Sequence, residues 1–133
     1  MARECALDNQ VLLLLVEDEA LIRMMLEDEL ADAGFAPVAA ADGRRALAEL
    51  EANPNRFRGV VTDIRLGRGP NGWEIARRAR ELVPDMPVVY VSGDSAYEWT
   101  ARGVPNSVMV AKPFNPAQVI TAVSALLDQS DAR

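Results

Sequence analysis

The stretch "GVVTDIRLG" (59–67) decides the fold, because an apolar segment of strand length ends there on a carboxylate. Val60 and Val61 begin what we predict to be a buried strand. Asp63 follows them, with a further apolar residue, Ile64, directly after it. An unpaired charge is costly in the interior of a strand. Asp63 therefore either caps a turn or stands at an open strand end, where a ligand can meet it.

Two apolar patterns alternate on both sides of this stretch. Continuous apolar runs are typical of strands buried in a parallel sheet, and apolar residues at three- and four-residue spacing are typical of amphipathic helices. Strands are predicted at 11–16, 35–41, 58–64, 86–92 and 106–111, and helices at 21–33, 43–53, 73–83, 95–102 and 116–129. This alternation predicts right-handed strand–helix–strand units, and therefore an α/β fold with a doubly wound, five-stranded parallel sheet.

Length and charge narrow the class of protein. The 133 residues fit one domain, and a formal net charge of -6 without a run of basic residues argues against direct nucleic-acid binding. The N-terminus has no long apolar segment behind a basic flank, so we expect a cytoplasmic protein without a membrane segment. We expect a flexible N-terminus at 1–9, one domain at 10–129 and a polar C-terminal tail at 130–133.

Histidine is absent from the sequence, and cysteine occurs once, as Cys5. These counts exclude Ser-His-Asp and Cys-His catalysis, histidine metal sites and a disulfide within the chain. Any chemistry must therefore use carboxylates, hydroxyls and Lys112.

Polar side chains stand at the carboxyl ends of four predicted strands. In chain order they are Glu17, Asp18 and Glu19 after the first strand, Asp63 near the end of the third, Ser92 at the end of the fourth and Lys112 after the fifth. Taken singly, each has an ordinary explanation as a turn former, a helix N-terminal acid or a solvated charge. In open parallel sheets, however, ligands bind where the carboxyl ends of the strands meet. Together, over residues 10–129, these residues resemble the receiver domain of two-component response regulators.

The resemblance implies a flavodoxin-like sheet with strand order 2-1-3-4-5 and a phosphorylation site. It assigns Asp63 as the acceptor of a phosphoryl group in a Mg²⁺-dependent reaction. Asp18 matches a direct Mg²⁺ ligand, and Glu17 matches a second acid that acts on the metal through water. Converging carboxylates repel one another, and a hard divalent cation makes their closeness favourable.

The same resemblance assigns roles around the phosphoryl group. Lys112 and Ser92 match the residues that contact its oxygens, and the backbone carbonyl of Arg65 matches a metal ligand. Pro113 matches a proline that follows a cis peptide bond. Arg65 and Asp94 flank the phosphoryl site, and their opposite charges predict an ion pair across its mouth.

The fifth strand departs from the family pattern. Typical receivers carry Tyr or Phe three residues before the lysine, where this chain has Met109. Tyr90 lies two residues before Ser92, and "YVSG" resembles the start of the motif of the FAT GUY receivers, although Asp94 departs from the bulky residue expected next. Alternate strand residues share a face, so we expect movement of Ser92 to reach Tyr90. Activation should then shift the end of the fourth strand and the short helix that carries Tyr97 and Trp99, and expose a surface for a target protein there.

Three functions remain open from the sequence. The first is a single-domain phosphorylation switch, which is phosphorylated by a sensor histidine kinase or a histidine phosphotransfer protein and then binds a target protein. The second is a phosphate sink or relay without output. In both, the chain catalyses its own phosphorylation and dephosphorylation without being a turnover enzyme, as a monomer or weak dimer. The third is an aspartyl-phosphate phosphohydrolase, a class that places a second aspartate where this chain has Arg65.

Overall fold

The computed structural model describes residues 11–131. The predicted flexible N-terminus and the last two residues of the predicted tail lie outside the described residues. The strands are β1 (Val11–Val16), β2 (Phe35–Ala40), β3 (Gly59–Asp63), β4 (Val88–Ser92) and β5 (Val108–Ala111). The α-helices are α2 (Ala20–Asp32), α3 (Gly43–Ala52), α4 (Gly72–Leu82), α5 (Trp99–Arg102) and α6 (Pro116–Asp131). Two 3₁₀ helices, η1 (Pro54–Arg56) and η2 (Ala96–Glu98), complete the described chain.

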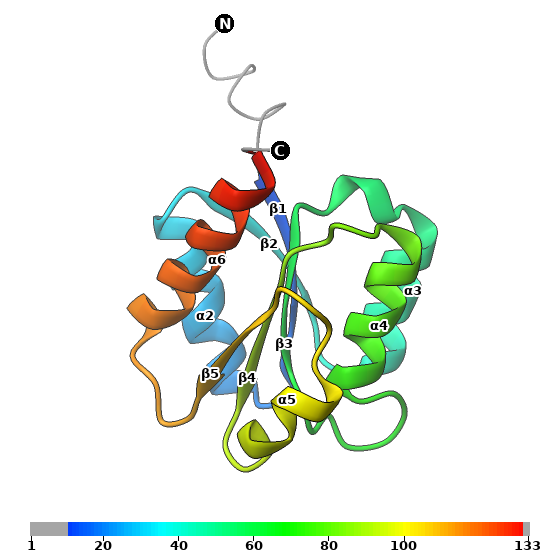
Figure 1. The fold of residues 1–133 in the computed structure, drawn as a ribbon. Coiled ribbons are helices and arrows are strands. Elements are labelled where there is room, and N and C mark those ends of the chain that lie inside the picture. Colours follow the sequence, from blue (N-terminus) through cyan, green and yellow to red (C-terminus); the bar gives the residue numbers. More distant parts are fainter. Residues whose placement is uncertain (1–10, 132–133) are drawn as a thin grey trace, which may run out of the picture.

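Neighbouring strands are parallel throughout the sheet, and their order is β2-β1-β3-β4-β5. This confirms the doubly wound sheet and the strand order that the resemblance implied. Helices α2 and α6 cover one face, and α3 and α4 cover the other (Figure 1). Among the helices at 11–131, none combines the length and hydrophobicity needed to cross a membrane.

The central strands pack on both faces. Leu13 and Leu15 of β1 lie in the core cluster beneath α2 and α6, whereas Leu14 and Val16 lie in the cluster beneath α3 and α4. All four side chains are fully buried. Burial of such a side chain contributes about 1.5–3 kcal/mol, so the two-sided position explains why the strand is apolar throughout.

The predicted boundaries hold to within two residues, and the main differences lie in short helices. Asp42 caps α3, since its carboxylate accepts the N–H of Arg45 at 2.8 Å. The segment predicted as one helix at 95–102 is η2 followed by a single turn of α-helix, and η1 was not predicted. Helix α6 continues to Asp131, two residues beyond its predicted end.

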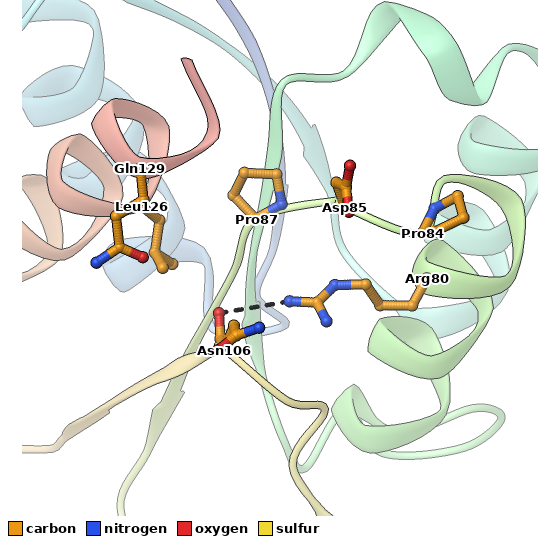
Figure 2. A pocket seen from close by; sticks show the side chains of 7 residues that line it. All are labelled: Arg80, Pro84, Asp85, Pro87, Asn106, Leu126 and Gln129. Atoms are coloured by element: carbon orange, nitrogen blue, oxygen red, sulfur yellow. Dashed lines mark hydrogen bonds between the residues drawn. The ribbon is translucent and has the colours of Figure 1, made fainter. Parts of the chain in front are cut away.

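Arg80 ties α4 to the segments that precede β4 and β5. Its guanidinium donates to the carbonyl oxygens of Met86 and Pro105, each at 2.6 Å, and of Asn106 at 3.4 Å. Figure 2 shows the bond to Asn106 beside a small cavity of about 40 Å³. This cavity lies at the amino ends of the strands, away from Asp63, so we assign Arg80 a structural role.

Gly72 lets α4 begin directly behind the strand end that carries Asp63. Its N–H donates to the carbonyl oxygen of Ile64 at 2.8 Å. A Cβ at position 72 would lie 2.2 Å from the carbonyl oxygen of Asp63 and 2.9 Å from the Cα of Ile64. These are backbone atoms, so a larger residue would displace the end of β3.

We expect Gly72→Ala to lower the free energy of unfolding by about 1–3 kcal/mol, which is the usual cost of overpacking. Gly93→Ala is the matched control, because its Cβ would lie 3.9 Å from the nearest atoms of Lys112. Urea denaturation of both variants and the parent measures the difference. An equal loss of stability in the two variants would contradict this role of Gly72.

Candidate functional site

Three carboxylates meet at the carboxyl ends of β1 and β3. Glu17 and Asp18 follow β1 directly, and Asp63 is the last residue of β3, its neighbour in the sheet. One carboxylate oxygen from each residue lies within 4.8 Å of the other two. Glu17 is fully buried and Asp63 is buried, whereas Asp18 is exposed. The acid cluster is therefore shielded from solvent at Glu17 and Asp63 and open to solvent at Asp18.

Lys112 offsets part of the charge of this acid cluster. Its Nζ donates to Asp63 Oδ2 at 3.0 Å and to Glu17 Oε1 at 3.3 Å. The backbone places this side chain, since the N–H of Lys112 donates to the carbonyl oxygen of Ser92 at 2.7 Å, and the bond to Pro113 is cis, as predicted. The Lys112 side chain thus extends from the end of the edge strand β5 past β4 to the end of β3.

Glu17 and Lys112, the two charged residues beside Asp63, differ in how they titrate. Burial raises the pKa of Glu17 from 4.5 to about 7; the N–H of Glu19 and the charge of Lys112 oppose this rise, and the charge of Asp63 adds to it. Burial lowers the pKa of Lys112, but its hydrogen bonds and attraction to Asp63 and Glu17 outweigh burial and leave the pKa raised. Lys112 is therefore a fixed positive charge at neutral pH, whereas Glu17 titrates near neutrality.

The donor set of the acid cluster fits Mg²⁺. All three side chains offer carboxylate oxygens, which this hard cation prefers, and one ammonium group cannot neutralise three carboxylates. The N–H of Ile64 donates to Asp63 Oδ1 at 2.7 Å and fixes the orientation of this carboxylate. The structure thus brings together Glu17, Asp18 and Asp63, while the metal role of the Arg65 carbonyl stays a prediction.

The opposite rim of the site comes from the segments that follow β3 and β4. The predicted ion pair is present, with Arg65 Nε 3.3 Å from Asp94 Oδ1. Ser92 Oγ accepts the N–H of Ser95 at 2.8 Å. A cavity of about 300 Å³ opens between this rim and the acid cluster. Arg65, Asp94 and Lys112 line it together with Asp18 and Asp63. The site is therefore a polar pocket with a charged pair at its mouth.

Tyr90 lies in the hydrophobic core beneath the site. Its ring centroid is 4.8 Å from that of Trp73, and its hydroxyl accepts the N–H of Val104 at 3.1 Å. Met109, its partner on β5, is half-buried and packs against the same core cluster. The switch roles of these two residues stay predictions, but Tyr90 has a direct bond to the segment that joins α5 to β5.

Two polar residues near the site have no role assigned to them by the sequence. The Glu19 carboxylate lies 3.9 Å from Lys112 Nζ and lines the same cavity. Ser95 is buried and bonds both Ser92 and Asp94. The acidic run after β1 was a signal for Glu19, whereas only its place next to Asp94 pointed to Ser95.

The raised pKa of Glu17 predicts a pH dependence of stability in the absence of metal. Between pH 4.5 and about 7 the folded state keeps a proton that the unfolded chain releases, so the free energy of unfolding falls as pH rises. A pKa difference of this size corresponds to about 3 kcal/mol. Thermal unfolding in EDTA at pH 5 to 8 measures this fall in stability. Added Mg²⁺ should make the stability depend less on pH.

Glu17→Gln should flatten this dependence, because a glutamine does not titrate. Glu19→Gln is the matched control, since it removes the same charge from a side chain that is 64% exposed. A parent protein and a Glu17→Gln variant with the same pH profile would contradict the assignment.

The match to a protein family and to curated proteins agrees with this geometry. Residues 13–124 match the response regulator receiver domain. The chain is 29% identical to the phyllosphere-induced regulator PhyR of Methylorubrum extorquens, over 98% of this chain and 49% of the relative. It is 31% identical to the transcriptional regulatory protein ResD of Bacillus subtilis, over 90% of this chain and 49% of the relative. The chain spans about half the length, or less, of the curated relatives it matches.

Solved structures share the fold. A response regulator receiver protein from Sinorhizobium medicae WSM419 is 48% identical, with a TM-score of 0.87 over 90% of this chain and 96% of that one. The receiver domain of the hybrid histidine kinase CckA is 27% identical, with a TM-score of 0.74 over 87% of this chain and 98% of that one. Because the family match covers most of the chain and solved receivers have its fold, this protein belongs to the response regulator receiver family.

Proposed function

We propose that this protein accepts a phosphoryl group from a partner phosphohistidine onto Asp63 in a Mg²⁺-dependent reaction, and that it signals by phosphorylation-dependent protein binding. One observation carries the proposal: the Asp63 carboxylate lies 3.0 Å from the Lys112 ammonium in a pocket that also holds two further acids. Receiver domains generally take phosphoryl groups from histidine kinases, which supports this assignment. We place the reaction in the cytoplasm, with the chain as a monomer or weak dimer.

In the proposed step, an Asp63 carboxylate oxygen attacks the phosphorus atom of the phosphohistidine. A P–O bond forms while the P–N bond breaks, and the electron pair of the broken bond stays on the imidazole nitrogen of the donor. The charge of the transition state lies on the equatorial phosphoryl oxygens, so catalysis consists mainly of positioning and charge stabilisation.

Lys112 and Ser92 supply contacts that suit the transferred group. The Lys112 ammonium, held beside Asp63, can stabilise negative charge on a phosphoryl oxygen. Ser92 Oγ accepts the N–H of Ser95, which leaves its own proton free to donate to a phosphoryl oxygen. Mg²⁺ held by Asp18 and Asp63, with Glu17 acting through water, would supply further positive charge at the same group.

The phosphoryl donor lies outside these 133 residues, because they contain no histidine. A sensor histidine kinase or a histidine phosphotransfer protein has the required phosphohistidine. We infer no phosphohydrolase activity, since Arg65 occupies the position two residues after Asp63 where that class places its second aspartate.

Asp63→Asn should abolish phosphorylation while the fold survives, because the amide keeps the shape of the side chain without its nucleophilic charge. The measurement is phosphate incorporation from a small phosphodonor plus Mg²⁺, located by mass spectrometry. Asp28→Asn on the exposed side of α2 is the control and should be labelled like the parent. Undiminished labelling of Asp63→Asn would refute the acceptor assignment.

A target-binding switch and a phosphate sink differ in what the phosphorylated form binds. Capture of a target by the protein with beryllofluoride and Mg²⁺, but not by the untreated protein, supports the switch. A protein that is phosphorylated yet has no partner that prefers this form is a sink or relay.

The segment from Trp99 to Ser107 is the expected reporter of activation. Trp99 Nε1 donates to Ser107 Oγ at 2.9 Å, and that hydroxyl donates to the carbonyl oxygen of Val104 at 2.6 Å. Tyr90 holds the N–H of the same residue, so a shift at the end of β4 reaches Trp99 through Val104. Tyr97 of η2 is already 83% exposed, so part of the expected target surface exists before phosphorylation.

Beryllofluoride plus Mg²⁺ should therefore shift the emission of Trp99 to longer wavelength, because the indole loses its hydrogen bond and contacts more water. A Trp73→Phe background leaves Trp99 as the sole tryptophan. Unchanged emission and unchanged amide shifts at 90–104, with responses elsewhere in the protein, would exclude this route.

A further inference from the structure

We propose that Ser95 is a positioning residue that holds the Asp94 carboxylate in place for Arg65, and that it thereby slows hydrolysis of the phosphoryl group on Asp63. The inference rests on the proposed function, because it concerns the lifetime of the phosphorylated form. Ser95 is a buried residue that belongs neither to the acid cluster nor to the residues proposed to contact the phosphoryl group.

The backbone N–H and the side-chain hydroxyl of Ser95 each donate a hydrogen bond to a residue of the rim. Its N–H donates to Ser92 Oγ at 2.8 Å, and its Oγ donates to Asp94 Oδ1 at 3.1 Å. The same Asp94 oxygen lies 3.3 Å from Arg65 Nε. Ser95 itself is only 2% exposed. One carboxylate oxygen is therefore shared between a buried hydroxyl and an exposed guanidinium.

The usual structural role of a serine at this position is not the one observed. Ser95 is the N-cap residue of η2, and serine at an N-cap commonly accepts a backbone N–H with its side chain. Here the side chain makes no such bond, and the N–H of Glu98 makes the first 3₁₀ bond of η2 to the carbonyl oxygen of Ser95. The hydroxyl is thus committed to Asp94.

The hydrogen bond from Ser95 to Asp94 favours formation of the ion pair between Asp94 and Arg65. The side chains of Arg65 and Asp94 are 73% and 57% exposed, and such pairs are weak because two mobile side chains must be ordered. The buried hydroxyl of Ser95 already restrains Asp94, so less conformational freedom is lost when Arg65 binds. The pair can therefore stay closed over the pocket for more of the time.

A closed pair obstructs hydrolysis. In that reaction a water oxygen attacks phosphorus, the P–O bond to Asp63 breaks, and its electron pair returns to the carboxylate. The water releases one proton to solvent, and inorganic phosphate leaves. Arg65 and Asp94 line the mouth of the 300 Å³ cavity that this water must cross.

The test compares phosphate release from the parent, Ser95→Ala, Arg65→Ala and the double variant. Each is loaded with acetyl phosphate and Mg²⁺, freed of donor, and followed over time. Ser95→Ala keeps the backbone bond to Ser92 and should release phosphate about two- to fivefold faster, the range that corresponds to an exposed ion pair. In the Arg65→Ala background it should have no further effect.

Ser124→Ala is the matched control, since it also removes a serine hydroxyl, but one that is half-buried on α6 and does not line the pocket. It should leave the release rate unchanged. An unchanged rate in Ser95→Ala, equal acceleration by Ser124→Ala, or additive effects of Ser95→Ala and Arg65→Ala would each overturn the proposal.

A second measurement needs no phosphorylation. The NMR resonance of the Arg65 Nε–H should move in Ser95→Ala toward its position in Asp94→Asn, and an unmoved resonance overturns the positioning role. If the parent takes up no phosphoryl group while this resonance moves, the proposed function fails but the placement of Asp94 by Ser95 stands.

Discussion

The site depends on the hydrogen bonds that the Lys112 ammonium donates to Glu17 and Asp63. Glu17 and Asp63 bring two buried carboxylates to neighbouring strand ends, and an uncompensated buried charge costs several kcal/mol. The only lysine of the chain donates to both. An ammonium group is a compact charge with three donors on a flexible stem, so one side chain from the edge strand can serve two acids.

The sheet geometry makes this contact possible. The order β2-β1-β3-β4-β5 places the acid of β3 between the acids that follow β1 and the strand that precedes the lysine. Close packing behind β3, where Gly72 meets the backbone of Asp63, keeps this strand end in position. The site therefore combines two kinds of charged group. Lys112 is kept positive by its hydrogen bonds and its attraction to Asp63 and Glu17, whereas burial raises the pKa of Glu17 to about 7.

The two sides of the pocket differ in burial. The acid cluster stands on strand ends that are buried on both faces, whereas the rim consists of long, exposed side chains on connecting segments. Ser95 links these two kinds of structure, because it is buried yet bonds a rim carboxylate. On the core side, Tyr90 extends from β4 to Val104, so the same strand contacts the pocket through Ser92 and the α5–β5 connection through its tyrosine.

The sequence by itself determined the five strands and the four long helices to within two residues, and the polar residues at the strand ends, because apolar periodicity and turn chemistry act over short stretches. The strand order came only with the resemblance to a family. Tertiary structure alone decided the bond between Lys112 and Glu17, residues 95 positions apart, and the raised pKa of the glutamate. It also decided that Ser95 binds Asp94 instead of capping η2. The contact between Lys112 and Glu17 depends on how distant segments pack, and no local pattern in the chain encodes that packing.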